Sequence, residues 1–435
     1  MSDNMNLYRL AAEELKRFFD SVNNHYNISE EVNPIEHIKY RIKKYDSIKH
    51  KLERKGYETT LENINEHIKD VVGFRIVCSF LSDLDELKNI ISSLEENGIK
   101  ITEIKDYITT PKKDSGYSSY HILVKVPVNY KDQVYYVNAE IQLRTIAMDM
   151  SASLEHKLCY KKEGYADSLR IMANKATGFC REVDEQLDNI VKSIDNNSVV
   201  VSNDILDDNS FVYPFMSGTS FNLLKLKYEE ALKFVTNEFI KLKNYYDIEE
   251  KLNPIEHIKS RIKNNNEIVR KLVEKDRIVN IDNVDKYVND LAGVRIVCSF
   301  LDDVEELKKF IYENSIQYST NIDTKKFFDI VEEKDYITNP KESGYRGYHF
   351  LVRVPVYTLS GVEFVKVEIQ LRTVAMEMWA SLEEKIAYHK EIDENIVNEL
   401  HRISSVTSVM DDNFNAMYNN SKKQNNVNIK KLVRK

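Results

Sequence analysis

Four acidic residues stand in sequence contexts that suit phosphate chemistry. Asp70 precedes a mostly apolar segment, Glu140 opens the string EIQLRT, and Asp290 and Glu368 occupy the same contexts further along the chain. One carboxylate of such a pair can hold Mg²⁺ between phosphate oxygens. The other can take a proton from a hydroxyl nucleophile. The four acids are therefore candidate catalytic and metal-binding residues for transfer of a phosphate group between nucleotides.

The string EIQLRT itself indicates a polar site. Strand alternation places Glu140, Gln142 and Arg144 on one face, with Ile141 and Leu143 on the other. A carboxylate, an amide and a guanidinium on one face could bind a polar ligand. A solvated sheet face with a local salt bridge would produce the same pattern.

Lysines and arginines recur at matching places and could neutralise charge on a transferred phosphate group. They are Arg41/Arg261, Lys43/Lys263, Lys51/Lys271, Arg75/Arg295, Lys105/Lys334, Lys112/Lys341 and Arg144/Arg372. On a helix expected from near Pro34, Arg41 and Lys51 would differ by about 80° in heading and could flank one groove. Arg75 interrupts an apolar strand and needs a partner or an anionic ligand. For any single lysine, solvent exposure is the simpler interpretation.

A short loop adds an aromatic ring to these charges. It is KDYITTPKKDSGYSSYH from Lys105 and KDYITNPKESGYRGYH from Lys334. Pro, Lys, Gly and Tyr in one run are typical of an ordered loop that approaches a ligand. Tyr117 and Tyr345 could stack on a base, and an ordinary hairpin loop with Tyr in the core is the alternative.

These recurrences arise because the chain is a duplication. Asn33–Leu52 and Asn253–Leu272 share 13 of 20 residues at an offset of 253 − 33 = 220. We expect a first domain over 5–195, a linker over 196–219 and a second domain over 220–420. Residues 421–435 form a basic tail that we expect to be disordered.

The elements expected in each copy form an α+β fold, a mixed β-sheet flanked by helices. In the first copy they are a helix near Tyr8–Val22, a helix after Pro34, a strand over GFRIVCSFL, a helix over Asp83–Asn97 that ends at Gly98, strands over His121–Pro127 and Val134–Leu143, and helices over Ala147–Tyr160 and Val183–Ile194. The second copy repeats the series, with helices near Phe221–Tyr246 and after Pro254.

Composition limits the partners and the compartment. A net charge of −8 argues against broad nucleic-acid binding, so no stable nucleic-acid partner is expected. Cys78 and Cys298 lie in identical apolar runs and are expected to be reduced core residues. Neither a signal peptide nor an apolar run of membrane-spanning length is present, which predicts a cytoplasmic protein without membrane contact.

The strings HIKYRIKKYDSIKHK, DVVGFRIVC, KDYITTPKKDSGYSSYH and EIQLRTIAMDMSASLEHKLCYK resemble the synthetase domain of the RelA/SpoT-type alarmone synthetases, above all the small members. The resemblance implies two tandem copies of a nucleotidyltransferase-like domain. It also implies transfer of the β,γ-pyrophosphate of ATP to the ribose 3′-OH of GDP or GTP, with release of AMP and with Mg²⁺ as cofactor. No hydrolase segment precedes either repeat, so the chain is expected to make alarmone and not degrade it.

The resemblance also assigns roles to residues. Asp70 and Asp290 would bind Mg²⁺, and Glu140 and Glu368 would act as base with a metal contact. On the ATP side it places Arg41, Lys43, Ser47, Lys51 and Arg75, with Arg261, Lys263, Lys271 and Arg295 in the second copy. On the GDP or GTP side it places Lys105, Lys112, Tyr117, His121, Gln142 and Arg144, with Lys334, Lys341, Tyr345, His349, Gln370 and Arg372.

The two copies depart from the family pattern at different places. In the second, Glu267 replaces Ser47, which puts an anion where the family has a phosphate contact and should weaken ATP binding. In the first, Ser118 and Ser151 stand where the second copy has Arg346 and Trp379. We therefore expect an active first copy, and a second copy that is either active or a nucleotide-binding regulator.

Alternative functions remain open on the sequence alone. They are a toxic relative that pyrophosphorylates the tRNA 3′ end, a non-catalytic nucleotide sensor, and use of an adenosine acceptor. The duplication also suggests that the two copies form an intramolecular pseudo-dimer, with a homo-oligomer as the other possibility.

Overall fold

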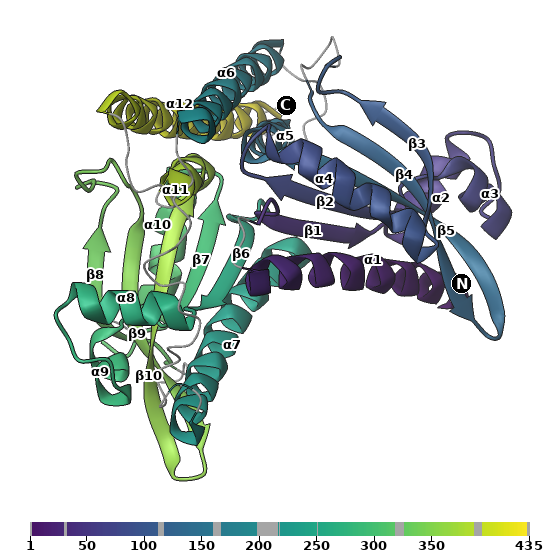
Figure 1. Cartoon of the computed structure of the whole chain (residues 1–435). Coiled ribbons are helices and arrows are strands. Elements are labelled where there is room, and N and C mark those ends of the chain that lie inside the picture. The colour runs from purple at the N-terminus through teal and green to yellow at the C-terminus, as the bar shows by residue number, and fades with distance from the viewer. Residues whose placement is uncertain are drawn as a thin grey trace. The chain divides into compact units, whose positions relative to one another are not determined.

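The computed structural model describes residues 2–29, 33–111, 117–159, 167–197, 216, 218–249, 251–317, 326–386 and 394–432. These residues divide into two compact units, Met1–Ser193 and Ile194–Lys435 (Figure 1). Each unit holds one five-stranded mixed sheet with helices around it, which confirms the predicted α+β class. The expected linker over 196–219 lies almost entirely outside the described residues.

The first unit runs through six helices, five strands and one 3₁₀ turn among its described residues. In chain order they are α1 (Ser2–Ser29), β1 (His37–Ile42), α2 (Tyr45–Glu53), α3 (Leu61–His67), β2 (Val72–Cys78), α4 (Asp83–Ser92), the 3₁₀ turn η1 (Ser93–Asn97), β3 (Lys100–Asp106), β4 (Tyr120–Tyr130), β5 (Gln133–Thr145), α5 (Ile146–Cys159) and α6 (Asp167–Asn197). The strand order is β1-β2-β5-β4-β3. Only the central pair β2 and β5 is parallel.

The second unit repeats this order. Its elements are α7 (Thr219–Ile248), β6 (Ile255–Ile262), α8 (Asn265–Glu274), α9 (Ile281–Tyr287), β7 (Ala292–Cys298), α10 (Leu301–Glu313), β8 (Asp329–Asp335), β9 (Tyr348–Thr358), β10 (Gly361–Thr373), α11 (Val374–Ile386) and α12 (Glu394–Leu432). Its strand order, β6-β7-β10-β9-β8, matches the first sheet strand for strand.

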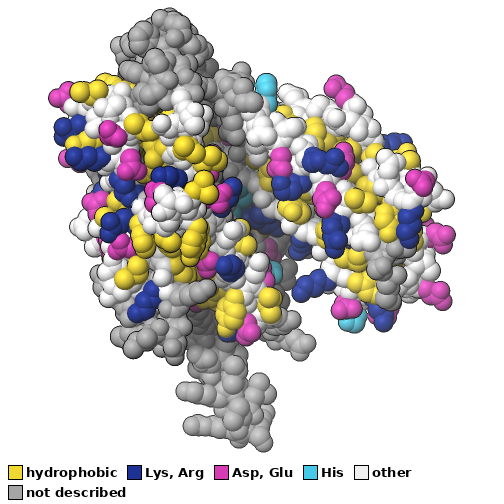
Figure 2. Space-filling model, turned by 90° about the horizontal axis from the view of Figure 1, so that it is seen from below, with side chains coloured by type: hydrophobic (Ala, Val, Ile, Leu, Met, Phe, Trp, Pro, Cys, Tyr) yellow, Lys and Arg dark blue, Asp and Glu magenta, His cyan; other side chains and the backbone are white. Residues whose placement is uncertain are grey.

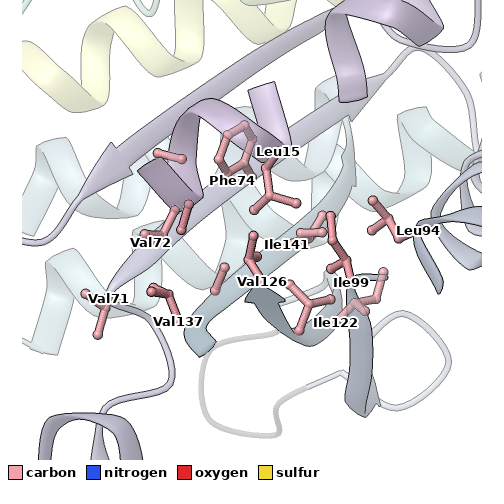
Figure 3. Close-up of a cluster of buried hydrophobic side chains, with 14 of the residues drawn as sticks. Leu15, Val71, Val72, Phe74, Leu94, Ile99, Ile122, Val126, Val137 and Ile141 are labelled. Carbon is pink, nitrogen blue, oxygen red and sulfur yellow. The ribbon is translucent and has the colours of Figure 1, made fainter. Parts of the chain in front are cut away.

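One face of each sheet is apolar and carries the core. In the first unit, Phe74 of β2 and Ile141 of β5 belong to this core, where Leu15 of α1 lies next to Phe74 and Leu94 of η1 lies next to Ile99 (Figure 3). Burial of such side chains is the main favourable term in folding. Cys78 and Cys298 are fully buried, as predicted for core residues. The opposite face of the sheet is left for polar side chains.

The prediction of a helix directly after Pro34 and after Pro254 is wrong. Residues 37–42 form the edge strand β1, which pairs antiparallel with β2, and 255–262 form β6. Ile38, Tyr40 and Ile42 alternate with polar residues, a period of two that belongs to a strand. Arg41 therefore lies on a strand and Lys51 on the following helix, so the groove deduced from one shared helix does not exist.

Other predicted elements agree with the structure in part. The helix over 83–97 ends at Gly98 as predicted, with its last turn in 3₁₀ form and Gly98 at φ +75°. The strand β3 and the short helix α3 were not predicted. The C-terminal segment was expected to be disordered, yet α12 continues to Leu432.

Across the described residues, every helix is too short or too polar to span a lipid bilayer. Figure 2 shows basic, acidic and apolar side chains interspersed on the face in view, without a broad surface of one charge.

Candidate functional site

A row of polar side chains crosses the polar face of the first sheet. The strand register aligns Lys39 with Arg75, Arg75 with Gln142, Gln142 with His121, and His121 with Lys105. Residues paired across neighbouring strands point to the same face. The row therefore brings one polar residue from every strand to one surface.

The second sheet has the same row from the same residue types. It consists of Lys259, Arg295, Gln370, His349 and Lys334. Two residues further along the strands, on the same face, a second row aligns. It consists of Arg41, Gly73 and Glu140 in the first unit and of Arg261, Gly293 and Glu368 in the second. The structure thus brings together, in each unit, most residues that the sequence singled out.

Asp70 lies two residues before β2 and is paired with two lysines. Lys43, which follows β1, and Lys51 of α2 both donate to its carboxylate, the latter over 2.9 Å. Burial raises the pKa of Asp70, but the two lysine bonds outweigh it and lower that pKa to about 2. A carboxylate held ionised between two cations is suited to a site that exchanges cations and phosphate oxygens.

Asp290 repeats this arrangement with one difference. Lys271 and Lys263 both reach its Oδ2, the second at 3.0 Å. Its Oδ1 is buried and has no hydrogen-bond partner among the described residues. The pKa of Asp290 is also lowered to about 2: burial raises it, and the charges of the two lysines outweigh burial.

Glu140 lies at the centre of a hydrogen-bonded network. His121 Nδ1 is 2.9 Å from its Oε1, and Gln142 Nε2 donates to its Oε2 over 2.8 Å. Burial raises the pKa of Glu140 and the charge of Asp70 raises it slightly, but the bonds from His121 and Gln142 leave it below its usual value. The charge of Asp70 acts on Glu140, so the two acids lie near enough to interact.

The network continues from Glu140 to the aromatic loop. Arg144 Nη2 donates to Gln142 Oε1 over 2.9 Å and to the Tyr117 hydroxyl over 2.6 Å. That hydroxyl also lies 2.8 Å from His121 Nε2. Arg144 is only 3% exposed, which excludes the solvated sheet face as the explanation of the EIQLRT pattern.

The tyrosine of the second unit, Tyr345, is buried more deeply than Tyr117. Tyr345 is 4% exposed, and its hydroxyl lies 2.6 Å from His349 Nε2. Lys341 and Arg372 stand over its ring at 4.7 and 5.0 Å. Stacking of Tyr345 on a base would require one of these cations to move.

Three predicted cations lie at the margin or outside this network. Lys105 and Lys334 are on the outer strands and pair with Glu103 and Glu332 at 3.2 and 3.1 Å. Lys112 lies outside the described residues.

Sequence reasoning missed a buried acid on the first turn of α5 and α11. Asp149 is within 2.9 Å of Lys39 and 2.7 Å of Arg75. Its equivalent, Glu377, is fully buried. The signal was available, because both copies carry an acid at this position and a lysine at 39 and 259, but an Asp in one and a Glu in the other escaped a search for identical residues.

The start of α2 differs from the start of α8. Ser47 is exposed on the first turn of α2, whose N-cap Lys44 makes no side-chain cap. In α8, Glu267 and Asn264 form a reciprocal capping box. Glu267 also pairs with Arg261 over 3.4 Å. In the second unit, Glu267 therefore both caps the start of α8 and pairs with Arg261, the candidate ATP-side arginine.

The donors present fit a magnesium ion that is shared with a substrate. Mg²⁺ is usually held by one or two carboxylates together with substrate phosphates and water. Asp70 with Glu140, and Asp290 with its unpartnered Oδ1 and Glu368, supply such pairs. Within the described part of the chain, no group of three or more His, Cys, Asp or Glu could hold a metal without a substrate.

Comparisons with known proteins identify the family of the chain. The family described as "Region found in RelA / SpoT proteins" matches residues 40–165 and 260–393. The GTP pyrophosphokinase YwaC of Bacillus subtilis (strain 168) is 42% identical over 190 residues, which cover 43% of this chain and 89% of that protein. The GTP pyrophosphokinase YjbM of the same organism is 34% identical over 188 residues, covering 42% and 82%.

Solved structures include the small alarmone synthetase 1 of Bacillus subtilis bound to its product pppGpp. It is 30% identical, with 47% of this chain and 98% of that chain covered and a TM-score of 0.41. The family match and the two relatives therefore carry the comparison. Each matched region contains every residue of one polar row except the lysine of the first strand, Lys39 or Lys259.

Proposed function

Because the chain belongs to the RelA/SpoT family, we propose that it is a GTP pyrophosphokinase that makes (p)ppGpp. It transfers the β,γ-pyrophosphate of ATP to the ribose 3′-OH of GDP or GTP and releases AMP. The observation that carries this proposal is the Asp70 carboxylate, held by Lys43 and Lys51, beside the Glu140 network on one polar face.

The candidate site residues of the first unit divide the reaction between them, beginning with the ATP side. Arg41 and Arg75 flank the adenine, and Lys43, Ser47 and Lys51 bind the phosphates of ATP. When the phosphates enter, the two lysines exchange Asp70 for phosphate oxygens, which costs little because both are ionic partners. Mg²⁺ held by Asp70 and Glu140 would neutralise charge on the transferred group.

The acceptor binds on the other half of the polar face. Tyr117 stacks on guanine, while Gln142 and Arg144 line the acceptor side with His121. Glu140 takes the proton of the 3′-OH, and its bond to His121 Nδ1 at 2.9 Å orients the carboxylate for that role. The equivalent roles in the second unit fall to Glu368, Tyr345, His349, Gln370 and Arg372.

The experiment is product analysis by chromatography after incubation with ATP, Mg²⁺ and one acceptor at a time. We expect AMP and a pyrophosphorylated guanosine nucleotide with GDP or GTP. The double variant Glu140→Gln/Glu368→Gln should lose this activity by at least about a hundredfold, while the exposed control Glu96→Gln keeps it. Product only with tRNA, only with an adenosine acceptor, or with none would contradict the proposal.

A division of labour between the units is a second part of the proposal. The first unit carries most of the transfer, and the second works with weaker ATP affinity because Glu267 engages Arg261 and the start of α8. We place the chain in the cytoplasm, where ATP and GTP are available and free cysteines such as Cys78 persist.

A pseudo-dimer of its two units remains our expectation, and an extended chain in X-ray scattering would contradict it.

A further inference from the structure

The buried acid on the first turn of α5 touches cations from both halves of the polar face. Asp149 Oδ1 lies 2.7 Å from Arg75 Nη1 and 3.4 Å from Arg144 Nη1. Its Oδ2 lies 2.9 Å from Lys39 Nζ and 3.7 Å from His37 Nε2. One carboxylate therefore joins an arginine assigned to ATP with an arginine assigned to the acceptor.

The second unit makes the same junction with a longer acid. Glu377 Oε1 lies 2.6 Å from Arg295 Nη1, and Oε2 lies 2.8 Å from Arg372 Nη1. The extra methylene lets each arginine have its own oxygen, whereas in the first unit both share Oδ1. Two acids of different length thus make the same pair of contacts, which would be unexpected for a purely local salt bridge.

The position is built for an ionised carboxylate. Asp149 is 5% exposed and Glu377 is fully buried. Both lie in the first turn of a helix, where the helix dipole favours a negative charge. Burial raises the pKa of Asp149, but Lys39, Arg75, His37 and Arg144 together hold it well below the usual value. Without this charge, Arg75 and Arg144 would repel each other at the surface that must receive two nucleotides.

We propose that Asp149 and Glu377 are positioning residues that hold the ATP-side and acceptor-side arginines in one fixed arrangement, so that both nucleotides bind in register with the reacting groups. The proposal rests on the assignment of the two arginines under the proposed function. It differs from direct contact with one nucleotide because it predicts a joint effect on two separate ligands, and from a merely structural role because a variant that keeps the charge should keep both affinities.

The test uses the full chain with transfer by the second unit removed by Glu368→Gln, and each titration is fitted with two sites, of which the site in the second unit stays the same in every variant. Calorimetry measures the affinities for a non-hydrolysable ATP analogue and for GDP separately, and steady-state kinetics gives both KM values and kcat. Asp149→Asn should weaken both affinities by about tenfold or more, since it leaves two arginines without their shared counter-charge. Arg75→Ala should weaken mainly the ATP analogue, and Arg144→Ala mainly GDP.

Asp149→Glu is the matched variant, because it installs the acid of the second unit. Both affinities should stay within about threefold of the parent, as the charge and both arginine contacts are kept. Glu96→Gln, an exposed acid with the same charge change as Asp149→Asn, should change neither affinity.

The outcomes separate this inference from the proposed function. Unchanged affinities in Asp149→Asn, weakening of only one, or a fall in kcat and thermal stability alone would overturn the inference. Should Asp149→Asn fail to fold by circular dichroism, Asp149→Glu decides, and a tenfold loss of either ligand would overturn it. A parent chain that binds both nucleotides but releases no AMP would reject the proposed function and leave the binding test intact.

Discussion

Exchanging Ser47 and Glu267 should move ATP affinity from one unit to the other. Both residues occupy the third position of a short helix, α2 or α8, beside the lysine pair that holds Asp70 or Asp290. We expect Glu267→Ser to strengthen ATP binding in the second unit and Ser47→Glu to weaken it in the first. The helix itself should survive, because Asn264 still caps α8 and loss of the capping-box partner costs about 1 kcal/mol.

The magnitude follows from the charge that Glu267 brings. A phosphate charge roughly 5 Å from its carboxylate costs about 1 kcal/mol at the dielectric constant of water and about 3 kcal/mol at an effective value of 20. Glu267 is 23% exposed and its partner Arg261 is 54% exposed, so the true cost lies between these limits. With about 1.4 kcal/mol per tenfold, the expected change in KM for ATP is roughly tenfold.

The assay measures AMP release against ATP concentration in chains with one working unit. Glu368→Gln isolates the first unit and Glu140→Gln the second. Glu274→Ser is the control, because it removes an exposed acid from the same helix α8, where its pair among the described residues is Arg270 at 3.7 Å. Equal KM values for ATP in the two isolated units, or no change on Glu267→Ser, would refute the reasoning.

Three predictions concern the stability of the fold. Burial raises the pKa of Asp184 to about 8, so the folded chain keeps a proton that the unfolded chain releases above about pH 4, and stability should fall by about 1 kcal/mol per pH unit between these values. Asp184→Asn should flatten that dependence in urea denaturation at several pH values. Gly344 has φ +88°, and an added Cβ would meet Ser404 Oγ at 2.6 Å, so Gly344→Ala should cost about 2 to 3 kcal/mol in thermal unfolding. Gly56→Ala, at φ +80° in open space, should cost only about 1 kcal/mol. Phe74→Ala should cost about 3 to 5 kcal/mol by the same denaturation, because the ring is 1% exposed in the core, and a loss under 1 kcal/mol would contradict that packing.

Periodicity predicted the centre of each sheet but failed at its edge. The strand around Phe74 and the alternation of Glu140, Gln142 and Arg144 are strong signals, because one face is fully buried and the other is not. The segment 37–42 was assigned to a helix because Pro34 suits a first turn, which gave a local cue more weight than the period of two. Edge strands pair on one side only, so their pattern is weaker and a nearby proline misleads more easily.

The candidate site was predictable as a set of residues, and its connections were not. Repetition between the copies identified Asp70, Glu140 and their cations without any structure, since drift had left these types unchanged. Which acid meets which cation depends on the register of strands far apart in the chain, such as β1 with β2 and β2 with β5. Asp149 likewise contacts Arg75 and Lys39, which lie 74 and 110 positions earlier in the chain, so sequence order does not link it to them. A comparison by chemical class, in which Asp149 and Glu377 count as the same charge, would have revealed it. For a duplicated chain, positions that keep a charge while changing length are therefore as informative as positions that keep their identity.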